Sequence, residues 1–396
     1  MTAAGSTIYV AVDTPILSIR EGIFESSYYG YPIELTLPGV CTNVRVVRRY
    51  SDFESLRNQL CMAHWYCIVA PIPEKESLQG KITTRDSNYS VMLEYRRIAL
   101  RRFLLRIAYH TILGKSPLLA RFANDEEWRE CAKNPIAVPP FLSANIAEDL
   151  VKSMHSPTPG KGDGAEYVRL LNMDFDNGGE LDGATIDGIN SYIAQLEGNL
   201  RSLRDRFQAL ANRRQGAGEA LLAFSSSFGA LADGEEDPFL RKAIRAVQQH
   251  GAQISVVYQD QSDNDMQKVV STLSYYVGLC AAVRQTLGNI WSAISKMRAL
   301  CVRVQAAEAR LTSVGMENLE SARNALAALT AEKMHREREM CGIDKTFKEE
   351  LCRFHREKQF DLRELLKVYA ELEVTFASNI KSKWEGLRPR LEDLAS

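Results

Sequence analysis

The stretch RRYSDFESLRNQL, Arg48–Leu60, joins the end of an apolar alternation to the start of an amphipathic segment. Residues 43–47 (NVRVV) alternate as a half-buried strand does. From Phe53 onward the apolar residues recur at helical spacing, and Asp52 is placed to cap a helix that begins there. Two arginines and a tyrosine therefore stand where a strand gives way to a helix. This combination suits an anionic ligand with a flat face.

The surrounding sequence predicts an α+β domain over the first ~125 residues. Residues 6–12 (STIYVAV) and 31–37 (YPIELTL) are rich in β-branched and aromatic side chains, and with residues 43–47 they predict a three-stranded antiparallel sheet. A proline-bounded loop, residues 70–81, precedes a second helix from Val91 to about His110.

The overall composition is that of a soluble protein, with 45% hydrophobic and 25% charged residues. The net charge of −1 gives no reason to expect nucleic acid as a partner. Charge is unevenly spread, however: residues 1–124 carry a net +5 and residues 125–187 a net −8. The eight cysteines form no CxxC pair, which favours a reduced, cytoplasmic compartment. We expect no leader and no transmembrane helix, so that any membrane role is peripheral.

Prolines and glycines cluster between residues 133 and 187 and indicate a linker, which we place at residues 129–184. Within it, FLSANIAEDLVKSM has the pattern of an amphipathic helix. The apolar face of this helix would hold Leu142, Ile146, Leu150 and Met154. Glu148 and Asp149 disfavour contact with anionic lipid, so insertion into a membrane stays open.

Residues 185–394 show a sustained apolar repeat of period near 3.5, which predicts three long helices in a coiled coil. The second helix should run from about Phe239 to Thr312, with a register break in residues 259–268 (QDQSDNDMQK). The third should run from Leu319 to beyond Leu372. Because one chain cannot cover all these apolar faces, we expect a curved dimer.

Nothing in the sequence forms a catalytic or metal-binding constellation. The six histidines are scattered, and GKGDG at 160–164 has no strand before it. DFDNGGELDGAT, Asp174–Thr185, imitates a calcium loop but has Thr185 where the bidentate carboxylate belongs. We therefore expect no enzyme activity, no cofactor and no metal.

Four residues from three segments have the chemistry to hold a phosphate group carried on a sugar ring. Arg49 offers a bidentate guanidinium, Tyr50 an aromatic face, and Lys75 and Arg96 two further cations. Taken singly, these charges would equally suit solvated strand ends and a polar helix face.

Three blocks, RRYSDFESL, APIPEKESLQGK and EYRRIALRRFLLRI, resemble the signature blocks of the phox-homology (PX) domain, in the same order. The remainder resembles a BAR domain, so that the chain is similar to sorting nexins of the PX-BAR type. The resemblance is closest to the retromer-associated members, through PEKESLQG and QLEGNLRSLRDRFQALANRR. The resemblance implies a PX domain at residues 6–128 and a dimeric BAR domain at residues 185–394.

The resemblance also implies roles for individual residues. Arg49 would hold the 3-phosphate of phosphatidylinositol 3-phosphate, and Tyr50 would lie against the inositol ring. Lys75 would reach the 1-phosphate, and Arg96 would bond the 4- and 5-hydroxyls. Arg48 is expected to be structural or peripheral, and Leu78 is a candidate for contact with the bilayer.

For the BAR part, the resemblance implies a curved dimer that presents basic side chains to anionic membranes. Residues 284–360 carry a net +4. The candidate membrane contacts are Lys296, Arg298, Arg303, Arg310, Arg323, Lys333, Arg336 and Arg338. Each is equally compatible with an ordinary solvated helix.

The implied function is that of a peripheral protein of early endosome membranes that senses or induces curvature in tubulation and cargo sorting. Its implied partners are phosphatidylinositol 3-phosphate, anionic membranes, a second copy or a related PX-BAR chain, and the retromer core subunits. The alternative is a coiled-coil scaffold whose PX-like domain binds proteins instead of lipid.

Overall fold

The computed structural model describes residues 8–20, 26–37, 39, 41–73, 86–124, 126–128, 181, 183–313 and 319–392. The chain falls into two compact units. The first comprises Met1–Gly80, Arg96–Glu197 and Gly278–His355, and the second comprises Lys81–Tyr95, Gly198–Val277 and Arg356–Ser396. The predicted boundaries at residues 128 and 184 stay a prediction, because the segment between them lies almost wholly outside the described residues.

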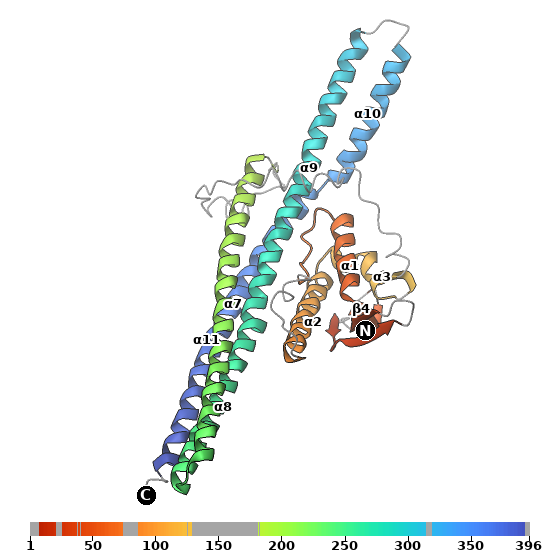
Figure 1. Ribbon diagram of the computed structural model, residues 1–396. Helices are drawn as coiled ribbons and strands as arrows, with labels where there is room; N and C mark the ends of the chain where they lie inside the picture. Colours follow the sequence, from red (N-terminus) through yellow and green to blue (C-terminus); the bar gives the residue numbers. More distant parts are fainter. Residues whose placement is uncertain are drawn as a thin grey trace, which may run out of the picture. The chain divides into compact units, whose positions relative to one another are not determined.

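An antiparallel sheet belongs to the first unit (Figure 1). Its strands are β1 (Tyr9–Val12), β2 (Ile16–Arg20), β3 (Ser26–Leu37) and β4 (Cys41–Arg49). The long β3 is central: β4 pairs along one of its edges, and β1 and β2 pair in succession along the other.

The prediction of three strands was wrong in one respect, because the first edge strand is divided into two pieces. Val12 pairs with Ile33, whereas Ile16 pairs with Gly30, so the edge accommodates one extra residue between the pieces. Pro15 lies in this interruption. Proline has no N–H to donate to the ladder and is tolerated at such an edge bulge.

The core of this domain lies between the sheet and three helices, α1 (Tyr50–Ala63), α2 (Asp86–Ala108) and α3 (Pro117–Phe122). Along β3, alternate residues are buried from Tyr31 to Leu37, as the period of a strand requires. The fully buried Phe53 of α1 meets the rings of Tyr31, Phe103 and Phe122 edge-on, at centroid distances of 6.4, 6.4 and 5.4 Å.

Helix α1 begins directly after β4, at Tyr50 and not at Phe53 as predicted. Arg49 is its N-cap residue, and the Oδ2 atom of Asp52 accepts a hydrogen bond of 2.7 Å from the Arg49 backbone N–H. Asp52 therefore lies in the first turn of α1 and accepts the N–H group of the N-cap residue. The prediction that Asp52 is itself the N-cap was wrong.

Two arginines of α2 hold the first edge strand. Arg97 donates to the carbonyl oxygen of Val12 at 2.7 Å, and Arg101 donates to that of Val10 at 3.2 Å. Part of the arginine-rich face of this helix is thus structural, because it satisfies carbonyl groups of the first strand.

The rest of the described chain is helical (Figure 1). The helices are α7 (Gly183–Gly234), α8 (Pro238–Asn264), α9 (Ser271–Ser313), α10 (Leu319–Met340) and α11 (Ile343–Glu392), with a π-helical turn, η4 (Asp265–Val270), between α8 and α9. The register break predicted for residues 259–268 overlaps the first four residues of this turn. A π turn inserts residues into the helical repeat, which is what the break in spacing reflects.

The third predicted helix is in fact two helices. Gly342 separates α10 from α11 with a φ of 80°, a left-handed conformation that favours glycine. The apolar repeat on either side of residue 342 concealed this break, since Met340 and Ile343 both suit a continuous register.

In the second unit, side chains from α7, η4 and α11 meet at Arg214. Its guanidinium lies 2.5 Å from Asp265 and 2.7 Å from Glu373, and it lies over the ring of Phe376. Phe207 and Tyr369 also pack edge-on at 5.1 Å. Within the described residues, no helix is both long enough and apolar enough to cross a membrane.

Candidate functional site

Arg49 occupies the junction between β4 and α1 with a partly open side chain. Its guanidinium carbon lies 5.1 Å from the centroid of the Tyr28 ring, and its Nε lies 3.9 Å from Oδ2 of Asp52. The side chain is 40% exposed, so the positive charge is accessible to solvent. The ring and the carboxylate hold the cation in place without burying it.

The preceding residue, Arg48, points into the domain, since successive side chains of a strand face opposite ways. It is 4% exposed and donates to the carbonyl oxygen of Phe122 from Nε at 3.0 Å and from Nη2 at 2.7 Å. The expectation that Arg48 is structural is confirmed. The two adjacent arginines thus have different environments.

Tyr50 links Arg49 to the second helix. The guanidinium of Arg96 on α2 lies 5.0 Å from the centroid of the Tyr50 ring. The Tyr50 hydroxyl donates to the carbonyl oxygen of Pro73 at 2.5 Å. Helices α1 and α2 therefore meet at Tyr50, the residue next to Arg49, while the Arg49 guanidinium lies over a different ring, that of Tyr28.

Lys75 and Leu78 lie outside the described residues, as do Leu142, Ile146, Leu150 and Met154. Pro73, which Tyr50 holds, is the last described residue before Lys75 in the sequence.

Tyr28 is a site residue that the sequence interpretation missed. It lies on β3 two residues before Gly30, which pairs with Arg49. An aromatic side chain at such a diagonal position reaches its cross-strand neighbour. The signal was available in the stretch SSYYGYP, but only the register shows which tyrosine faces Arg49.

The basic residues predicted to contact membranes differ in exposure. Five are exposed: Arg298, Arg303, Arg310, Arg323 and Arg338. The other three are half-buried: Lys296, Lys333 and Arg336.

The half-buried members have partners within the helices. Arg336 pairs with Glu332 at 2.8 Å, and Lys333 pairs with Glu337 at 3.7 Å. Burial, together with the charge of Arg336, lowers the pKa of Lys296. These three are weaker candidates for lipid contact than the five exposed arginines.

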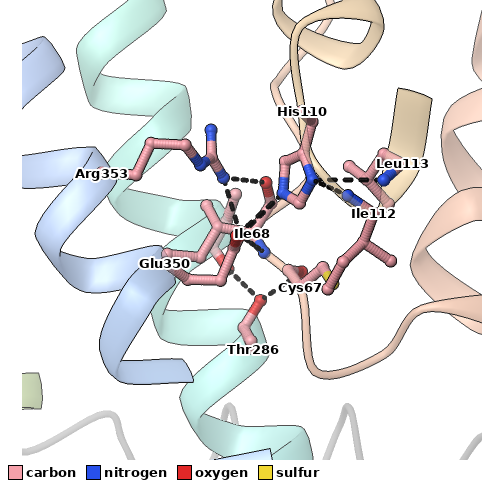
Figure 2. A network of polar contacts seen from close by, with 9 residues as sticks. Cys67, Ile68, His110, Ile112, Leu113, Thr286, Glu350 and Arg353 are labelled. Carbon is pink, nitrogen blue, oxygen red and sulfur yellow. Dashed lines mark hydrogen bonds and ion pairs between the residues drawn. The ribbon is translucent and has the colours of Figure 1, made fainter. Parts of the chain in front are cut away.

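A second polar cluster lies between the sheet domain and helices α9 and α11 of the first unit (Figure 2). Glu350 of α11 is 3% exposed and accepts hydrogen bonds from the Ile68 backbone N–H at 2.8 Å, from His110 Nε2 at 3.0 Å and from Arg353 at 2.7 Å. Burial raises the pKa of Glu350, but the hydrogen bond from His110 and the charge of Arg353 outweigh it, so that the net pKa is lowered. The carboxylate is therefore ionised and accepts hydrogen bonds from three donors.

Cys67, His110 and Glu350 are close enough to hold a metal ion, but their chemistry does not suit one. Nδ1 of His110 accepts the N–H groups of Ile112 and Leu113 at 3.1 and 3.2 Å, which places the ring proton on Nε2, facing Glu350. Burial raises the pKa of the Cys67 thiol, away from the thiolate that a metal requires. The cluster is therefore a hydrogen-bonded joint.

Comparison with known proteins follows the same division of the chain. The model of the family described as Vps5 C terminal like matches residues 186–390, and the PX domain model matches residues 41–126. Sorting nexin-2 of Homo sapiens is 25% identical over 360 residues, which cover 88% of this chain and 66% of that protein. Sorting nexin-1 of Bos taurus is 26% identical over 362 residues, covering 88% and 65%. The chain thus spans just under two thirds of the length of these relatives.

A solved structure has a similar fold. The cryo-EM structure of the SNX-BAR Mvp1 tetramer matches with a TM-score of 0.57 and 16% identity, and the match covers 96% of this chain and 99% of that one.

Proposed function

The chain belongs to the sorting nexins of the PX-BAR type, and on this premise we propose that it binds phosphatidylinositol 3-phosphate on endosomal membranes and senses or induces their curvature. Its role would be tubulation and cargo sorting in endosome-to-Golgi or recycling transport. It would act without catalysing a reaction.

One observation carries the proposal: Arg96 lies over the ring of Tyr50, the residue next to Arg49, although Tyr50 and Arg96 are 46 positions apart in the sequence. Arg49 would hold the 3-phosphate, because a guanidinium can bond a phosphate with two parallel N–H groups. Tyr50 would lie against the inositol ring and Arg96 would bond the 4- and 5-hydroxyls. Lys75 would reach the 1-phosphate.

The contact between Arg49 and Asp52 is compatible with this role. At 3.9 Å and with a partly exposed arginine, this ion pair is weak. A phosphate group carries more negative charge and a better bidentate geometry, so it would compete well for the same guanidinium.

Exposed apolar side chains of the second unit support a dimer. They comprise Leu203, Leu222, Phe224 and Leu231 on α7, Phe239, Leu240 and Val256 on α8, and Phe360, Leu366, Val374 and Trp384 on α11. Exposed apolar surface of this extent favours coverage by a second chain, either another copy or a related PX-BAR protein. The retromer core subunits are proposed as a further partner.

Each exposed arginine of α9 and α10 would contribute about 1 kcal/mol near an anionic surface. Such contacts and the headgroup site would reinforce each other by raising the effective concentration of the second contact once the first has formed. Stable attachment is therefore expected to need both.

The test is sedimentation of the full chain with vesicles that contain phosphatidylinositol 3-phosphate. Arg49→Ala should abolish the binding that depends on this lipid. Arg45→Ala is the matched control, because it removes an exposed arginine from the same strand. Binding by Arg49→Ala equal to that of the control would count against the site. Failure of the unaltered chain to bind any phosphoinositide would instead favour the protein-binding scaffold.

A further inference from the structure

The segment of residues 65–73 follows α1 and ends two residues before Lys75 in the sequence, and its first half is fixed to helices α9 and α11. Asn289 donates to the carbonyl oxygen of Trp65 at 3.2 Å, and Thr286 donates to that of Cys67 at 3.1 Å. The next amide, that of Ile68, donates to Glu350. Three hydrogen bonds to side chains on two helices thus fix the backbone of residues 65–68.

The contact is also tight in its apolar part. A Cβ atom added to Gly278 of α9 would lie 2.8 Å from Cβ of Pro71, so glycine is what allows the helix to approach this closely. Cys67, Ile68, Val69 and Ala70 are each at most 5% exposed.

The other end of the segment reaches the candidate lipid site. The carbonyl oxygen of Pro73 accepts the Tyr50 hydroxyl, and the Tyr50 ring lies beside Arg96. A continuous run of nine residues therefore connects the candidate lipid site at Tyr50 and Arg96 to Glu350 and Thr286.

Glu350 is the centre of this joint (Figure 2). It joins the Ile68 backbone, His110 after the end of α2, and Arg353 one turn further along α11. Arg353 also donates to the carbonyl oxygen of Ile68 at 3.4 Å. A charged acceptor with donors from three segments permits few alternative arrangements, because any shift leaves a buried group unpaired.

We propose that Glu350 is a positioning residue that holds the headgroup site (Arg49, Tyr50 and Arg96) in one orientation on α9 and α11. In this orientation the headgroup site and the exposed arginines of α9 and α10 contact the same membrane together. This inference rests on the proposed function. Loss of the hydrogen bonds of Glu350 would leave the headgroup site and the exposed arginines each able to bind lipid. It would remove the gain in affinity that comes from binding one membrane through both.

The test compares Glu350→Gln with Glu349→Gln in the full chain. Glu349 is exposed and lies next to Glu350 on the same helix, so both variants remove one negative charge from α11. Three measurements are made: amide hydrogen exchange of residues 65–70 without lipid, affinity for soluble short-chain phosphatidylinositol 3-phosphate, and binding to phosphatidylcholine–phosphatidylserine vesicles that contain this lipid.

For Glu350→Gln we expect exchange of residues 65–70 to rise roughly tenfold or more, since local opening becomes easier. Affinity for the soluble headgroup should stay within about twofold, while vesicle binding should fall roughly tenfold or more. Glu349→Gln should change none of the three.

An equal loss of soluble and vesicle binding, or unchanged vesicle binding despite faster exchange, would overturn the inference. If the unaltered chain binds no headgroup, the proposed function fails, and the exchange measurement alone decides whether Glu350 forms the joint. Thr286→Val removes only the hydroxyl that holds Cys67 and should shift exchange and vesicle binding in the same direction. If Glu350→Gln does not fold, Thr286→Val tests whether the contact between residues 65–68 and the helices is needed for vesicle binding.

Discussion

The guanidinium group of Arg48 holds the carbonyl oxygen of Phe122, 74 residues later in the chain, with hydrogen bonds of 3.0 and 2.7 Å. Its neighbour Arg49 faces the opposite way, toward Tyr28 and solvent. The strand alternation therefore separates two identical side chains into a structural cation and a candidate ligand-binding cation. Substitution of each should have a different consequence.

Arg48→Met is expected to lower the free energy of unfolding by about 3 kcal/mol, because a buried carbonyl group loses its charged donor. Arg49→Met should change it by less than about 0.5 kcal/mol, since the side chain is partly exposed and its ion pair is long. Denaturant unfolding of both variants measures the difference. Equal destabilisation would mean that Arg49 also supports the fold.

The proximity of Tyr50 and Arg96 was predictable from the sequence, because each residue belongs to a block whose order and chemistry resemble one family. The helical repeat was also readable, together with a register break in residues 259–268, since a packed coiled coil imposes its period on every turn. That this break is a π turn at Asp265–Val270 was not predicted.

The joint at Glu350 could not be predicted in the same way. Ile68 and Glu350 are 282 residues apart, and the group that Glu350 holds is a backbone amide, which any residue could supply. A single acid on an amphipathic helix is also indistinguishable from a solvated one until its burial is known. Tyr28 was missed for a related reason, since its role depends on strand register.

The Tyr50 ring and hydroxyl make separate contacts, so they can be tested separately. Tyr50→Phe keeps the ring beside Arg96 and loses the bond to Pro73, and should cost about 1 kcal/mol of stability with little change in headgroup affinity. Tyr50→Leu should lower that affinity roughly tenfold, as expected for a lost aromatic face. Calorimetric titration with soluble phosphatidylinositol 3-phosphate measures both. Equal losses of affinity would assign the effect to the hydroxyl.

Gly278→Ala and Gly198→Ala should act in opposite directions although both glycines lie in long helices. Alanine in a helix is favoured by about 1 kcal/mol over glycine, and nothing lies within 4 Å of a Cβ atom at position 198. At position 278 the new atom meets Pro71 at 2.8 Å, and overpacking costs about 1–3 kcal/mol. Thermal unfolding should therefore shift up for Gly198→Ala and down for Gly278→Ala. A higher unfolding temperature for both variants would show that the segment at Pro71 can move away without loss of stability.

Acid should weaken the joint through Glu350. Because its folded pKa is lowered, its contribution is fully present above the unfolded glutamate value of about 4.3 and is lost as pH falls through the lower folded value. The titratable and charged groups around it are Cys67, His110 and Arg353. The stability difference between the unaltered chain and Glu350→Gln should thus be constant from about pH 7 to pH 5 and shrink below about pH 4. A difference that grows with acid would contradict the assigned direction.

Arg214 in the second unit offers the sharpest test of a buried charge. It lies between Asp265, which is 0% exposed, and Glu373. Arg214→Met leaves both carboxylates without this cation and should lower the unfolding free energy by about 3–5 kcal/mol. Arg213→Met is the control, because that neighbouring arginine is exposed. Adding Asp265→Asn to Arg214→Met should restore part of the loss, since the buried position then carries no charge. Denaturant unfolding followed by circular dichroism measures all three variants, and a double variant less stable than Arg214→Met would show that the penalty does not come from the unpaired carboxylate.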